Sequence, residues 1–144
     1  MQKSTFTHLI LGLAIIAGSV ACGSSFAIHD VDYSQPIESV LTPDSENMIH
    51  DQRFAVKFSV SGLLEEEGVS SIEELRMIRN HTGLYYLIAS GFQHVYIFEP
   101  ELSSFKLSEK IRISENGISQ PAFNQRGSYI ELIDRSTGDT FNLD

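Results

Sequence analysis

The chain is poor in several residue types, and each shortage excludes a class of protein. Cysteine occurs once, at Cys22, so no disulfide can form within the chain. Positive charge is also scarce: 10 Lys and Arg stand against 19 Asp and Glu, and the formal net charge is −9 at pH 7. Such an acidic chain repels a phosphate backbone, and no basic run is present to neutralise one. We therefore expect no nucleic-acid partner.

A hydrophobic run long enough to span a membrane is also missing. The most apolar stretch covers residues 9–20, whereas a membrane-spanning helix needs about 20 apolar residues. Lys3 precedes this stretch and small residues follow it, which is typical of a signal peptide for export. A buried core helix is the alternative, and it would have to accommodate Gly12 and Gly18.

The residues after the apolar stretch carry a family resemblance. The letters VAC at 20–22, followed by GSS, resemble the lipobox of bacterial lipoproteins, where the cysteine is acylated and becomes the new N-terminus. This resemblance implies that residues 1–21 are a signal peptide and that Cys22 is the lipid-attachment residue. Gly23 in place of Asp implies an outer-membrane lipoprotein facing the periplasm or the surface. The alternative is ordinary cleavage after residue 21 or after Ala27, which gives a soluble periplasmic or secreted protein.

The rest of the chain divides into a tether and a domain. Residues 22–52 contain Pro36, Pro43 and scattered acids without a sustained period, which predicts a flexible tether with short extended pieces such as 37–41. Residues 53–144 form the predicted compact β-rich domain. Alternating or continuous apolar patterns predict strands in seven segments: 53–60, 84–90, 94–99, 105–113, 118–123, 128–134 and 140–143. The alternation predicts that Lys57 points to solvent and that Leu107 points inward, with a break in the pattern at Glu109.

Two segments between these strands decide the rest of the fold. Residues 62–69 are predicted to turn the chain. In 71–79, Ser71 and Glu74 match a helix capping box and favour a helix, although the alternation of Leu75 and Met77 also permits a strand. The predicted class is therefore mainly β (α+β): a small antiparallel β-meander sheet with one short helix, after the signal peptide and tether.

No motif for a metal, a nucleotide or a nucleophile is present. His29 and His50 lie beside acids in the tether, where a solvated acidic linker is the simpler interpretation, and His81 and His94 match no zinc pattern. Ser90 lacks the G-x-S-x-G context, and no phosphate-binding glycine motif occurs. We therefore expect no metal, no nucleotide and no other cofactor.

The acidic clusters also have structural explanations. Acids in 65–67 and 73–74 fit a turn and the first turn of a helix, and the loop 134–139 fits turn chemistry without a calcium ion. Export, an anchor and the lack of a catalytic motif together predict a non-catalytic binding or assembly module. Its expected partners are envelope proteins or assembly components, with the membrane contacted through the N-terminal lipid. The alternative is an exported small hydrolase or ligand-binding protein that uses Asp, Glu and His94.

Overall fold

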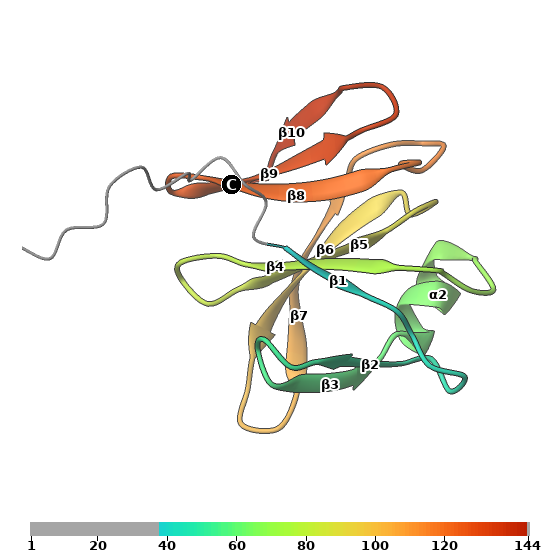
Figure 1. Cartoon of the computed structure of the whole chain (residues 1–144), viewed down its shortest axis with the longest axis vertical. Helices are drawn as coiled ribbons and strands as arrows, with labels where there is room; N and C mark the ends of the chain where they lie inside the picture. The colour runs from blue at the N-terminus through green and yellow to red at the C-terminus, as the bar shows by residue number, and fades with distance from the viewer. Residues whose placement is uncertain (1–37, 144) are drawn as a thin grey trace, which may run out of the picture. The chain divides into compact units, whose positions relative to one another are not determined.

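The computed structural model describes residues 38–143, and Figure 1 shows how their strands are arranged. The predicted signal peptide, the lipid-attachment residue Cys22 and the tether up to residue 37 lie outside the described residues. Within the described part, all strand pairs are antiparallel and one short helix is present, so the predicted mainly β class is confirmed. No helix in residues 38–143 has both the length and the apolar character to cross a membrane.

The strands form three sheets. The largest has the order β1-β4-β5-β6-β7, the second has the order β10-β9-β8, and β2 and β3 form a hairpin. The bounds of the strands are as follows: β1 Ser39–Leu41, β2 Met48–Asp51, β3 Val56–Ser59, β4 Leu75–Arg79, β5 Tyr85–Ala89, β6 His94–Pro100, β7 Phe105–Arg112, β8 Pro121–Arg126, β9 Tyr129–Asp134 and β10 Thr140–Asn142.

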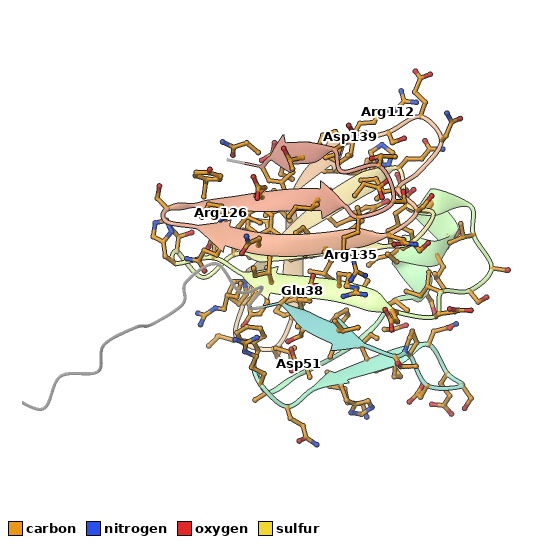
Figure 2. The ribbon with its side chains drawn as sticks, turned by 45° about the horizontal axis from the view of Figure 1, so that its top comes forward. Glu38, Asp51, Arg112, Arg126, Arg135 and Asp139 are labelled. Carbon is orange, nitrogen blue, oxygen red and sulfur yellow. The ribbon has the colours of Figure 1, made fainter. Side chains whose placement is uncertain are left out.

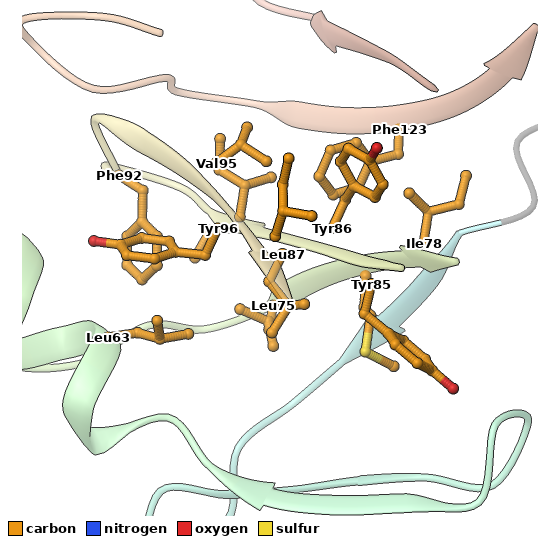
Figure 3. Close-up of a cluster of buried hydrophobic side chains, with 14 of the residues drawn as sticks. Leu63, Leu75, Ile78, Tyr85, Tyr86, Leu87, Phe92, Val95, Tyr96 and Phe123 are labelled. Carbon is orange, nitrogen blue, oxygen red and sulfur yellow. The ribbon is translucent and has the colours of Figure 1, made fainter. Parts of the chain in front are cut away.

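The five-stranded sheet is covered on both faces. Residues opposite each other in an antiparallel pair share a face, so Tyr85 and Leu87 point to one side while Tyr86 points to the other. Figure 3 shows Tyr86 directed toward β8 and its Phe123, and Tyr85 directed away from them. All five residues of β5 are buried, which confirms the prediction of a central strand.

The helix lies where a turn was predicted, and the prediction of a helix over 71–79 is wrong. Helix α2 covers Ser61–Glu67, buries Leu63 and Leu64, and ends at Gly68 with a φ of 68°. Segment 75–79 is instead strand β4, paired on both sides with β1 and β5. A strand buries apolar side chains on both faces here, which a helix with a single apolar stripe could not do.

The boundary at residue 53 is also wrong, because part of the predicted tether belongs to the fold. Residues 39–41 pair with β4 as the expected extended piece, and residues 48–51 pair with β3.

At the other edge of the large sheet, the ladder between β6 and β7 shifts register after the pair Ile97 and Glu109. This irregularity agrees with the break in alternation at Glu109, while Leu107, predicted to point inward, is 48% exposed.

Two backbone hydrogen bonds join the loop between β5 and β6 to the segment that leads into β8, and so connect the large sheet to the three-stranded sheet. The N–H of Gly91 donates to the carbonyl of Ile118 at 2.8 Å, and the N–H of Ile118 donates to the carbonyl of Phe92 at 3.1 Å. A side chain on Gly117 would place its Cβ 2.4 Å from the Gly91 carbonyl oxygen, and its φ is 76°. Both facts require glycine at position 117.

A buried carboxylate makes the second connection. Glu38 precedes β1, and its side chain is 7% exposed. One oxygen accepts a hydrogen bond from Arg76 Nη1 on β4 at 2.9 Å, and the other accepts from the N–H of Phe123 on β8 at 2.7 Å. Figure 2 shows Glu38 at the start of β1, beside β4. Glu38 thus satisfies an outward-facing N–H of β8 and links the two sheets.

Replacement of Glu38 by Ala should lower the free energy of unfolding by about 3 kcal/mol. The substitution leaves the N–H of Phe123 without its acceptor and removes the buried partner of Arg76. Urea unfolding followed by circular dichroism measures the loss. Glu99→Ala is the control, because the ion pair of Glu99 with Lys106 lies at the surface and should contribute little to stability. Equal losses in the two variants would contradict the connecting role of Glu38.

Candidate binding cleft

A cleft of about 410 Å³ lies between strand β3 and the loop that joins β6 to β7. Four consecutive residues at and before the start of β3 form one wall, and the loop forms the other. The lining residues are Ala55, Val56, Lys57, Phe58, Tyr85, Pro100, Glu101, Leu102, Ser103, Ser104 and Phe105. This volume falls within the usual range for a binding site of about 300–1,000 Å³.

Aromatic rings form the floor of the cleft. The ring of Phe105 lies 4.8 Å from that of Tyr85 and 5.6 Å from that of Phe58, measured between centroids. Phe54 supports the floor from the side, with an edge-on contact to Tyr85 at 5.6 Å. Pairs at these separations stabilise each other, so the floor is a rigid apolar surface that the fold provides in advance.

The cleft runs along the edge of β3. Successive residues of a strand point to opposite faces, so a cleft on one face would touch only alternate residues. This cleft touches residues 55, 56, 57 and 58, and it touches no residue of β2. It therefore lies on the side of β3 that faces away from β2, where no described strand pairs with β3.

The rim of the cleft combines charge with an exposed apolar side chain. The ammonium of Lys57 makes no hydrogen bond or ion pair with any residue in 38–143. On the opposite wall, Glu101 accepts a hydrogen bond from Ser104 Oγ at 2.8 Å. Leu102, at the tip of this wall, is fully exposed with a relative accessibility of 109%. An apolar side chain in this position is available to a partner.

A smaller cavity of about 180 Å³ lies between β4 and the loops around β8 and β9. It contains two of the predicted carboxylates, Glu73 and Glu74, beside Arg76. Glu74 is bound to Arg76 at 2.8 Å, and Arg76 is bound in turn to Glu38. Ser90 also lines this cavity, and its hydroxyl donates to the carbonyl of Ser119 at 2.7 Å. These partners explain Glu74 and Ser90 as structural groups.

A third group of polar residues joins α2 to β6. The side chain of Glu67 is 1% exposed. Its carboxylate accepts from the Tyr96 hydroxyl at 2.7 Å and from the N–H of Gln93 at 2.7 Å, and it lies 2.9 Å from His94 Nδ1. Burial on its own raises the pKa of Glu67, but the bonds from Gln93, Tyr96 and His94 together hold this pKa below its ordinary value.

The same contact acts on the tyrosine in the opposite direction. Burial, followed by the hydrogen bond to Glu67, raises the pKa of the Tyr96 hydroxyl well above its ordinary value. Among the described residues, the pair of Glu67 and His94 is thus the one place where two of the predicted titratable candidates are in direct contact. Neither residue lines the cleft or the smaller cavity. The contacts attach the helix to the sheet.

The other predicted candidates stay apart. His50 lies 3.8 Å from Asp44, while its neighbour Asp51 points to the other face of β2 and accepts from the N–H of Arg53. His81 lies in the turn between β4 and β5, and Asp134 binds Ser136 within its own loop, as turn chemistry predicts. His29 and Cys22 lie outside the described residues. In residues 38–143, no three His, Cys, Asp or Glu side chains gather as metal ligands.

Sequence reasoning missed the loop wall of the cleft. The prediction that Lys57 points to solvent is confirmed, but nothing local showed that it borders a cleft. A leucine at position 102, within a short polar loop, is the signal that could have been noticed. Comparison with known proteins adds no homologue, because no family model, curated protein or solved structure matches this chain.

The free energy of unfolding should depend on the ionisation of Glu67. A carboxyl with a lowered folded-state pKa stabilises the fold above its unfolded pKa, and this contribution is lost as the pH falls through the folded value. Glu67→Gln should therefore be about 2 kcal/mol less stable than the parent at pH 7. The gap should narrow below pH 4.5, the ordinary pKa of this group. Urea titrations at pH 7, 5 and 3 measure the difference in the free energy of unfolding between the two proteins.

Glu66→Gln provides the control for Glu67, since Glu66 forms an exposed ion pair with Lys110. Its loss of stability should stay below about 0.5 kcal/mol at pH 7. A gap for Glu67→Gln that stays constant between pH 7 and pH 3 would show that the ionised carboxylate does not hold α2 to β6.

Proposed function

We propose that this chain is an exported, lipid-anchored envelope protein, and that its folded domain is a non-catalytic binding or assembly module. The signal-like segment 1–21 and the lipobox-like VAC support the anchor at Cys22. Several acyl chains on one residue give lasting membrane attachment, since each buried methylene contributes about 0.8 kcal/mol. The proposed location is the outer membrane, with the domain facing the periplasm or the surface.

One observation carries the binding role: a strand edge that pairs with no described strand borders a cleft with an aromatic floor, and the rim of this cleft carries the fully exposed Leu102. Unpaired edges and exposed apolar side chains are features that folded domains normally protect. Their combination at a preformed aromatic floor suits the capture of a segment from another protein. The proposed partners are envelope proteins or assembly components.

The arrangement of titratable groups supports binding over hydrolysis. A hydrolase would need an acid and a base that converge on a cavity. Glu67 and His94 are close enough to exchange a proton, but the carboxylate of Glu67 is enclosed and used by the contacts that attach α2. The cleft itself contains Lys57 and Glu101 on opposite walls, and the carboxylate of Glu101 is bound to Ser104.

The anchor is tested by metabolic labelling. Cells that express the chain and receive a palmitate analogue should label the parent protein, while Cys22→Ala should lose the label and leave the membrane fraction. Ser24→Ala, two residues away, is the control and should keep both the label and the location in the membrane fraction. Equal label in the Cys22→Ala and parent proteins would overturn the anchor.

The recognition surface is tested by photocrosslinking in the same cells. A photoreactive phenylalanine replaces Leu102 at the cleft in one variant and Leu107 in the other. Leu107 is a fair control, because it is 48% exposed and does not line the cleft. Irradiation should produce an adduct with another envelope protein from position 102 and not from position 107. Equal yields from the two positions would show that the cleft is not the recognition surface.

A further inference from the structure

We propose that the cleft takes an extended segment in which an acidic residue lies between two apolar residues, and that this segment pairs with β3 as an added strand. This inference rests on the binding role proposed above and gives the partner its chemistry. It follows from the hydrogen bonding of β3, from the floor of the cleft and from the charge of Lys57.

The hydrogen bonds of β3 direct the backbone groups of Lys57 and Ser59 away from β2, and of these two residues only Lys57 lines the cleft. The N–H of Val60 donates to the carbonyl of Asn47 at 2.9 Å, so this pair is hydrogen-bonded across the hairpin. Bonded pairs alternate along an antiparallel ladder, so the pair of Phe58 and Ile49 is bonded too. The N–H and carbonyl of Lys57 then point to the opposite edge, into the cleft. A residue placed opposite Lys57 can exchange two backbone hydrogen bonds with it.

The side chains of the added strand are set by this register. A residue opposite Lys57 would have its side chain on the same face as the Lys57 ammonium. The backbone N–H of Met48 lowers the pKa of Asp44 by its hydrogen bond, and this ammonium adds a smaller effect through its charge. The ammonium forms no hydrogen bond or close ion pair in the described part of the chain. A carboxylate is the complement of this cation. The residues before and after it would point to the other face, toward the rings of Phe58 and Phe105, where apolar side chains fit.

Other described edges and a second copy of the chain fit less well. Strand β7 carries a register shift and the charged side chains of Lys106 and Lys110, features that discourage pairing. Strand β10 has three residues. Pairing of β3 with β3 of a second copy, centred on Lys57, would set two ammonium groups opposite each other. The charge therefore favours a different, acidic partner.

Fluorescence anisotropy with three labelled peptides tests the inference on the full-length chain in detergent micelles. The first peptide contains Val-Glu-Phe between serines, the second has Lys in place of Glu, and the third carries an N-methyl group on the Glu nitrogen. The first should bind about tenfold more tightly than the second, because one pairs with Lys57 and the other repels it. The third peptide should bind about fivefold or more weakly than the first, because its methylated nitrogen cannot donate a hydrogen bond to the carbonyl of Lys57.

Variants of the chain give the decisive comparison. Lys57→Glu should reverse the preference between the first two peptides, and Lys57→Gln should abolish it. Lys110→Glu, on β7 outside the cleft, should leave this preference unchanged, because Lys110 pairs with Glu66. Circular dichroism verifies that each variant is folded.

Each outcome either supports or overturns the proposal. Equal affinity for the Glu and Lys peptides, or no loss on N-methylation, would overturn it, as would a lack of binding by the first peptide. An adduct of the chain with itself from position 102 would identify a second copy as the occupant and overturn it too. If the peptides fail while position 102 still crosslinks another envelope protein, the binding role stands and this partner chemistry is wrong. If both fail, the binding role fails as well.

Discussion

The fold depends on the buried carboxylate of Glu38, which holds together strands that are distant in sequence. Its two oxygens bind Arg76 on β4 and the N–H of Phe123 on β8, while Glu38 itself leads into β1. The carbonyl of the same residue accepts a hydrogen bond from Arg53, whose guanidinium lies over Phe54. One residue thus places the three-stranded sheet on one side of β4 and the turn of the β2–β3 hairpin on the other. The bond from Arg53 fixes the turn that precedes β3, the strand that forms one wall of the cleft.

The strands that could be predicted are those whose side-chain pattern reports a local environment. Strand β5 is apolar on both faces because it lies at the centre of the large sheet, and the Lys57 strand alternates because only one of its faces is covered. The pattern fails where two elements bury similar numbers of apolar residues. Leu63 and Leu64 bury one side of a short helix, and Leu75 alternates with Met77 in a strand, yet the capping-box match at Ser71 favoured a helix there. Tertiary pairing with β1 and β5 decided the outcome.

The cleft could not be predicted because it depends on contacts between segments far apart in the chain. Phe58 and Phe105 meet through the packing of a hairpin on a sheet, and neither residue has a local signal that indicates the other. Glu38 shows the same limit, since its partner on β8 is 85 residues away. Features of single residues were more accessible: the outward direction of Lys57 followed from strand alternation, and the structural role of Asp134 followed from turn chemistry. The explanation of Glu74 by the first turn of a helix was wrong, because Glu74 precedes β4 and pairs with Arg76.

The loop of residues 101–104 restricts how a partner can approach the edge of β3. Neighbouring strands in a sheet lie about 4.8 Å apart, so an approaching sheet would bring a second strand close behind its first. The loop forms the wall of the cleft opposite β3, on the side where such a second strand would have to lie. We therefore expect a single extended chain to fit beside β3 more readily than the edge of an intact sheet. Such a wall would leave the edge of β3 open to one ligand geometry and protect it from sheet-to-sheet aggregation.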